Sequence, residues 1–120
     1  MSVTKLIIHA AWSTNHRKNQ LSDAIRKEVC QHIIENAKSR SIKIAEIIVL
    51  ADHIHLLIKI HATQNLSQLI HNIKGESSNW INTLKLTRFP FEWQEGYLAE
   101  TVSTLGCLKI HINHLLKIHF

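Results

Sequence analysis

Proline, glycine and cysteine are scarce in this chain of 120 residues, which contains one proline, three glycines and two cysteines. Low proline and glycine content, together with 45% apolar residues, excludes a linker or a fibre and is typical of a soluble α/β or α+β protein. The length corresponds to one compact domain, so we expect residues 1–120 to form a single domain.

The two cysteines, Cys30 and Cys107, stand far apart in the sequence and form no CxxC pair. That spacing argues against a zinc site built from thiolates and against a disulfide scaffold. We therefore predict that both are small core residues.

Long apolar runs are also absent. The longest uncharged apolar stretches, such as Ile47 to Ala51, fall far short of the roughly 20 residues that span a bilayer. The N-terminus has no basic segment followed by an apolar run and a small-residue cleavage site, so no signal peptide is expected. These absences predict a protein without a membrane anchor and with a cytoplasmic location.

The formal net charge is +5 at pH 7. A basic balance favours an anionic partner, and nucleic acid is the usual one for a small soluble domain. Charge supports nucleic-acid binding without establishing it, because many basic proteins bind no nucleic acid.

Hydrophobic periodicity and turn signals predict the order of secondary structure. The expected elements are a strand over 3–12, a helix from Ser22 or Asp23 to 38–41, strands over 43–50 and 53–60 joined at Ala51 and Asp52, a helix from Asn65 or Ser67 to near Lys85, one or two short strands around Gly96, and a last helix beyond Ser103 or Thr104. The sum is an α+β protein whose antiparallel sheet carries two helices on one face. The extra C-terminal helix is free to lie on the other face or to reach a partner subunit.

The most informative segment is Asp52-His53-Ile54-His55-Leu56-Leu57. Residues two apart on a strand point to the same face, so His53 and His55 project together. Two imidazoles side by side can bind a divalent cation, which can then polarise a phosphate. The plain alternative is that both histidines merely lie on a solvent-exposed strand face.

With its surroundings, this segment resembles the strand that carries the metal-binding histidines in the single-tyrosine HUH transposases of the insertion-sequence-200-like family, which includes REP-associated relatives. The resemblance continues at Leu66-Ser67-Gln68-Leu69-Ile70, at Ile73-Lys74-Gly75-Glu76-Ser77-Ser78 and at Phe91-Glu92-Trp93-Gln94-Glu95-Gly96-Tyr97. It thus covers nearly the whole chain in matching order. It implies a ferredoxin-like fold, a homodimer, Mg²⁺ or Mn²⁺ at the histidine pair, and cleavage of single-stranded DNA beside a hairpin by a helix tyrosine.

The sequence departs from that family where the nucleophile should stand. The best local match to the family's tyrosine segment is His111-Ile112-Asn113-His114-Leu115, which puts His111 at the tyrosine position, and an ungapped alignment puts Asn113 there. The one tyrosine of the chain, Tyr97, matches a strand aromatic beside Gly96. We therefore expect cleavage to be impaired, or to use Tyr97, His111 or water as the nucleophile.

The family's third metal ligand would fall on Leu115 or Lys117, and neither suits a divalent ion. His111 or His114 could instead complete a site with His53 and His55, His114 being our candidate third ligand. A third imidazole would shift the preference toward Zn²⁺, Ni²⁺ or copper. The alternative is that these histidines lie on the surface of an amphipathic helix.

Candidate contacts to DNA phosphates are Arg17, Lys18, Lys74 and Arg88, which lie near the ends of predicted elements or on the second helix. Lys74 is the foremost candidate, because the adjacent Gly75 permits close approach of a backbone. For the other basic residues a solvated surface is an equal alternative.

Three functions remain open. The first is a transposase-type protein that binds a metal ion and hairpin or single-stranded DNA with impaired cleavage. The second is a working metal-dependent endonuclease or transposase with an unorthodox nucleophile. The third is a repurposed structural or regulatory dimer that has lost both the metal and the DNA.

Overall fold

A computed structural model describes residues 5–61 and 63–102 of the chain. In chain order the elements are β1 (Lys5–Ser13), the 3-10 helix η1 (Asn15–Arg17), α1 (Asp23–Ser39), β2 (Lys43–Val49), β3 (His53–His61), α2 (Leu66–Thr83) and β4 (Leu98–Val102). The predicted last helix lies outside the described residues, and with it Cys107, His111, Asn113 and His114. Each predicted element up to Lys85 is confirmed to within a few residues.

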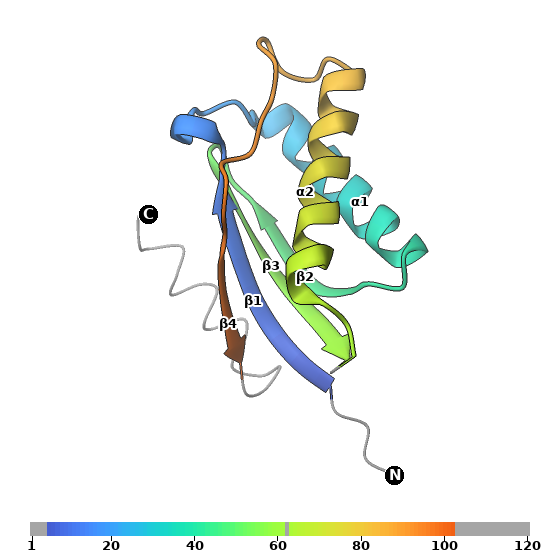
Figure 1. Ribbon diagram of the computed structural model, residues 1–120. Coiled ribbons are helices and arrows are strands. Elements are labelled where there is room, and N and C mark those ends of the chain that lie inside the picture. Colours follow the sequence, from blue (N-terminus) through green and yellow to red (C-terminus); the bar gives the residue numbers. More distant parts are fainter. Residues whose placement is uncertain (1–4, 62, 103–120) are drawn as a thin grey trace.

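The four strands form one antiparallel sheet in the order β2-β3-β1-β4, and both helices cover the same face of it (Figure 1). The chain order β-α-β-β-α-β with the two central strands β1 and β3 side by side is the ferredoxin-like arrangement. The predicted α+β class and the predicted placement of two helices on one face are therefore confirmed.

The residues of β3 alternate between the two faces of the sheet because successive side chains on a strand point to opposite sides. Four apolar side chains of β3 are buried in the main core beneath the helices: Ile54, Leu56, Ile58 and Ile60. His53, His55, Leu57 and Lys59 belong to the other face. Leu57 is fully buried there in a second, smaller apolar cluster with Ile7, Ile48 and Val102. We call this face, opposite the helices, the histidine face.

Both helices present a stripe of buried side chains to the sheet, as their periodicity predicts. The buried residues are Val29, Ile33 and Ala37 on α1, and Ile70, Ile73, Ser77 and Ile81 on α2. The side chain of Asn65 caps α2 by accepting a hydrogen bond from the backbone N–H of Gln68 at 3.1 Å. The other predicted cap of this helix, Ser67, lies inside it.

A polar contact joins the two helices at their exposed edge. The His32 ring stacks on the Trp80 ring at a centroid distance of 4.0 Å, and its Nε2 lies 2.6 Å from Oε1 of Glu76. Trp80 is half-buried and packs against the core. Its indole therefore serves helix packing.

The segment between α2 and β4 is held by side-chain hydrogen bonds and by backbone hydrogen bonds to residues 13–15, without a regular strand ladder. Asn82 donates to the carbonyl of Phe91 at 2.9 Å and accepts from its N–H at 2.7 Å. Trp93 is 5% exposed and forms a single bridge with Thr14. Of the two short strands that the sequence allowed around Gly96, the structure contains one, β4, which begins two residues after that glycine.

Cys30 is only half-buried at the edge of the main core, where it packs against the buried residues. Burial raises the pKa of its thiol, and a hydrogen bond with the backbone of Val49 opposes that effect. Among the described helices, none is long and apolar enough to cross a membrane.

Candidate metal and DNA site

His53 and His55 lie together on the histidine face of β3, as the sequence predicts. Their ring centroids are 5.1 Å apart and the rings are nearly perpendicular, at 81°. His55 is fully buried, whereas the His53 side chain is 15% exposed. The plain alternative of two imidazoles on a solvent-exposed strand face therefore does not describe this pair.

The turn that leads into β3 is fixed by main-chain contacts from neighbouring segments. The N–H of Thr14 donates to the carbonyl of Asp52 at 2.8 Å, and the N–H of Leu21 donates to the carbonyl of Ala51 at 3.0 Å. The Asp52 carboxylate lies 2.6 Å from Nδ1 of His53. Asp52 thus reaches the histidine that follows it and restrains that ring.

A third histidine, His9 of β1, supports His55 from the neighbouring strand. Nε2 of His9 lies 3.0 Å from Nδ1 of His55, and the two rings are stacked with centroids 5.2 Å apart. Nδ1 of His9 lies 3.2 Å from Oε1 of Glu100 on β4. Since β1 pairs with both β3 and β4, the sheet register aligns these three side chains across three strands.

The direction of these hydrogen bonds determines which imidazole nitrogen is available to a metal. A carboxylate only accepts, so the Nδ1 atoms of His53 and His9 carry the proton. When His9 is neutral, its Nε2 accepts a hydrogen bond from Nδ1–H of His55. In that protonation state both histidines of the pair have the lone pair on Nε2. Such support of the second ring nitrogen is usual for histidines that bind metals, so the donor set fits a divalent ion.

The described residues supply two ligands of such a site and not a third. In residues 5–61 and 63–102, no three histidine, cysteine, aspartate or glutamate side chains converge so that they could hold one ion. His111 and His114, the candidates for completing the site, lie outside that part of the chain.

Three of the four predicted DNA contacts lie at the end of the sheet where His53 begins β3. Ser13 pairs with His53, and Arg17 and Lys18 follow Ser13 directly through η1. Lys18 lines a shallow pocket together with Phe89, the neighbour of Arg88. All three basic side chains are exposed.

Lys74, the foremost candidate on the sequence, has intramolecular contacts. Its ammonium donates to the carbonyls of Gln94 and Gly96 at 2.7 and 2.8 Å and lies 5.9 Å from the centre of the Trp12 ring. Burial lowers the pKa of this ammonium, and the carboxylate of Glu95 opposes the effect. Lys74 thus fastens residues 94–96 to α2, while its contact with DNA stays a prediction.

Gly75 has open space beside it. A Cβ added at this position would meet no atom within 4 Å, so packing of the described chain does not require glycine here. Tyr97 is 38% exposed and lies between Gly96, whose φ is +80°, and the first residue of β4.

Sequence reasoning missed His9, Glu100 and Phe89. His9 and Glu100 become relevant only through the pairing register of β1 with β3 and β4, which local periodicity does not encode. Phe89 is 65% exposed, and the Arg88 guanidinium lies 5.6 Å from the centre of its ring. The sequence contained a signal for Phe89, because an aromatic side chain beside an arginine is a candidate for stacking on an unpaired base.

Comparison with known proteins identifies a matching family and related folds. The profile of the family described as "Transposase IS200 like" matches residues 2–112. A crystal structure of a protein from Deinococcus radiodurans R1, assigned as a transposase, superposes with a TM-score of 0.78 at 21% identity, covering 97% of this chain and 92% of that one. A REP-associated tyrosine transposase bound to a REP hairpin superposes with a TM-score of 0.68 at 15% identity, covering 98% and 71%. The search of curated proteins finds no match.

The fold defines a ferredoxin-like α+β protein with a histidine pair, one fully buried and one partly buried, on a central strand. The family match covers most of the chain, and the chain therefore belongs to the IS200-like transposase family. Its general function is accordingly in DNA transposition.

Proposed function

We propose that this protein binds hairpin or single-stranded DNA and holds a divalent metal ion at Nε2 of His53 and His55. The observation that carries the proposal is that both Nδ1 atoms are engaged, one by Asp52 and the other by His9. Mg²⁺ or Mn²⁺ is the expected ion. Zn²⁺ or Ni²⁺ is expected if His114 is a third ligand.

In such a site the described residues have two roles, orientation of the metal-binding imidazoles and binding of DNA. Asp52 and His9 orient the two imidazoles, whereas Arg17, Lys18 and Arg88 bind the DNA backbone by charge. A divalent ion, when bound, polarises the scissile phosphate and neutralises charge that develops during cleavage. Phe89 offers an exposed ring on which an unpaired base can stack.

By the family resemblance, the nucleophile position falls on His111 or Asn113, and the one tyrosine of the chain is Tyr97. We infer that cleavage is impaired and that DNA binding is the main activity. An active endonuclease that uses Tyr97, His111 or water is the second candidate. Such an enzyme would lose the family's route to strand rejoining if water attacked, because no covalent intermediate would form.

Two further features are part of the proposal. The REP-associated relative is bound to a hairpin, which supports a hairpin as the DNA partner of this chain. A homodimer is expected from the family resemblance, and sedimentation of the purified protein would measure it.

The first test incubates the purified full chain with labelled single-stranded DNA that carries a hairpin, in the presence of Mg²⁺ or Mn²⁺. A native gel measures binding, and a denaturing gel measures cleavage and any protein-linked product. We expect binding that weakens steeply with salt, with little or no cleavage. Cleavage that His53→Ala removes would instead support the active enzyme, and the absence of both binding and cleavage would favour a repurposed dimer.

Removal of the support for His55 should weaken the metal site without removing a ligand. His9→Phe keeps a ring of similar volume at a buried position but offers no hydrogen bond to Nδ1 of His55. We expect the Kd for Mn²⁺, measured by calorimetry, to rise about 10- to 100-fold, as is typical for loss of a supporting contact.

Glu100→Gln is the matched control, because its amide oxygen can still accept a hydrogen bond from His9. This variant should retain most of the affinity, whereas Glu100→Leu should lose part of it. If His9→Phe bound Mn²⁺ as tightly as the wild type, His9 would have no positioning function.

A further inference from the structure

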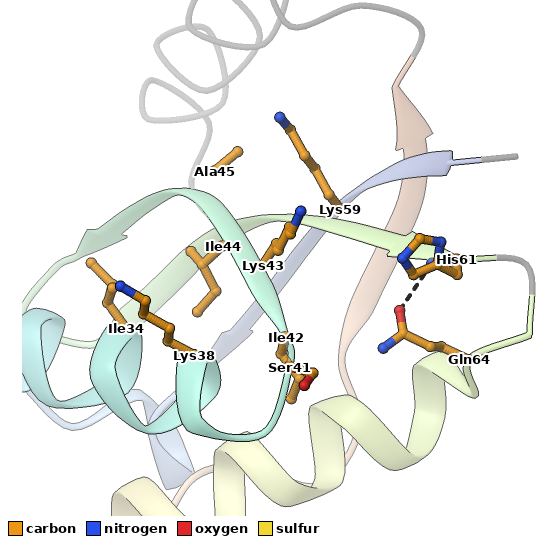
Figure 2. A pocket seen from close by; sticks show the side chains of 10 residues that line it. All are labelled: Ile34, Lys38, Ser41, Ile42, Lys43, Ile44, Ala45, Lys59, His61 and Gln64. Atoms are coloured by element: carbon orange, nitrogen blue, oxygen red, sulfur yellow. Dashed lines mark hydrogen bonds between the residues drawn. The ribbon is translucent and has the colours of Figure 1, made fainter. Parts of the chain in front are cut away.

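A groove at the far end of β3 from His53 combines an apolar floor with a basic rim. It has a volume of about 610 Å³, within the roughly 300 to 1,000 Å³ of ordinary ligand sites. Ile34, Ile42 and Ile44 form the floor, and Ile34 is 40% exposed. Basic side chains border it, namely Lys38 of α1, Lys43 of β2, and Lys59 and His61 of β3 (Figure 2). Lys43 and Lys59 project from the histidine face, whereas Ile42 and Ile44 face the helices.

The arrangement of two of these lysines is unfavourable for the isolated chain. Lys43 and Lys59 are direct partners in the antiparallel pairing of β2 with β3, and their side chains project from adjacent strands (Figure 2). Like charges that lie directly opposite each other on neighbouring strands repel and destabilise the sheet. An anion between the two ammonium groups would remove that repulsion.

Neighbouring carboxylates do not supply that anion within the described part of the chain. All ten described residues that line the groove are neutral or basic. In residues 5–61 and 63–102, no carboxylate oxygen lies within 4.0 Å of the ammonium of Lys38, Lys43 or Lys59. Glu46, the next acidic residue on β2, pairs with Leu57 beyond the irregularity at Ala45 and does not line the groove.

Two general roles of surface lysines account for Lys38 and Lys43 but not for Lys59. Lys38 lies in the last turn of α1, where a positive charge interacts well with the helix dipole. Lys43 lies on the edge strand β2, where lysines discourage pairing with other chains. Neither reason applies to Lys59, which lies on an inner strand directly opposite Lys43.

We propose that this groove, whose lining extends around the edge strand β2, binds a nucleotide of a DNA strand. Its flanking phosphates lie between Lys43 and Lys59 on the histidine face, and its base turns around the edge toward Ile34 and Ile44 on the helix side. The inference rests on the proposed function, since it makes the groove a second contact for the DNA that reaches His53 and His55. An apolar floor fits the face of a base, and the paired lysines fit consecutive phosphates.

The spacing along β3 gives the length of DNA that joins the two sites. Lys59 lies four residues after His55 and six after His53, which corresponds to about 13 to 20 Å along the strand. At the spacing of about 3.4 Å per nucleotide that a strand has in duplex DNA, a strand stacked in that way needs roughly four to six nucleotides to span that distance. Single-stranded DNA shorter than this should therefore be insensitive to substitutions in the groove.

The test measures the affinity of the full chain for labelled single-stranded DNA over a series of salt concentrations, by fluorescence anisotropy. Lys43→Gln and Lys59→Gln should each raise the Kd several-fold and lower the slope of log affinity against log salt by about 1. Lys27→Gln, an exposed lysine of α1 outside the groove, is the matched control and should leave the slope nearly unchanged.

The apolar floor is tested separately with Ile34→Glu and with DNA that contains an abasic position. The abasic nucleotide is placed about four to six positions from the phosphate at the metal site. We expect it to lower the DNA affinity of the wild type and to leave the DNA affinity of Ile34→Glu unchanged. Mn²⁺ binding should be unchanged in all groove variants, because the groove and the histidine pair occupy opposite ends of β3.

Several outcomes would overturn the inference. If the wild type binds DNA but the groove variants keep its Kd and salt slope, the groove contacts no DNA while the proposed function stands. If the variants change only the sedimentation of the protein, the groove is occupied by a second copy of the chain. If the wild type binds no DNA, the proposed function fails together with this inference. The wild-type measurement alone distinguishes that case from failure of the groove.

Discussion

Replacement of His55 by alanine is expected to abolish tight binding of a divalent ion, because Nε2 of that imidazole is one of two proposed ligands from β3. The increase in Kd for Mn²⁺ should exceed the roughly 10- to 100-fold that loss of a supporting contact typically causes. Calorimetric titration of the purified protein with Mn²⁺ measures it, and His53→Ala should have a similar effect.

Leu57→Ala is the matched control, since Leu57 is also fully buried on the histidine face of β3. Loss of its side chain should destabilise the fold by about 2 to 5 kcal/mol without weakening the metal site. Retention of wild-type affinity in both His53→Ala and His55→Ala would remove the pair from the metal site.

Replacement of Trp93 by alanine should cause the largest loss of stability among residues of the segment between α2 and β4, which carries Arg88 and Phe89. Trp93 packs edge-on against the rings of Trp12 and Phe91, and its indole N–H donates to Oγ of Ser77 at 2.9 Å. We expect the free energy of unfolding in urea to fall by about 3 to 5 kcal/mol, the usual cost of emptying a buried tryptophan site. The segment that carries Arg88 and Phe89 should lose its anchor.

Phe89→Ala, in the same segment, should affect DNA binding rather than stability, because this ring is 65% exposed. Its unfolding free energy should change by less than about 0.5 kcal/mol. Its affinity for single-stranded DNA should fall by about 1 to 3 kcal/mol, the usual contribution of one stacked base. An unchanged DNA affinity in Phe89→Ala would show that the exposed ring is not a stacking platform.

Lys74 illustrates how a family-like motif can carry a structural contact. The sequence favoured a phosphate contact for it, because it precedes Gly75 in a segment that resembles the family. The structure shows that its ammonium fastens the backbone of residues 94–96 to α2. Two of its three donor hydrogens are thereby used within the chain.

Local patterns in the sequence were sufficient for the order of the elements and for the histidine pair. Alternation with a period of two places His53 and His55 on one face of β3 whatever the rest of the fold does. The helical stripes of α1 and α2 likewise depend only on residues three or four apart. These features follow from short-range geometry, and a single sequence therefore predicts them.

Tertiary structure alone decided the surroundings of that pair and the basic groove. His9 and Glu100 are 91 residues apart in the chain, and only the pairing of β1 with β3 and β4 aligns them with His55. Lys43 and Lys59 oppose each other because of the register of β2 on β3. The register of two paired strands depends on long-range packing of whole strands, because a shift by one residue moves every side chain of a strand to the other face of the sheet.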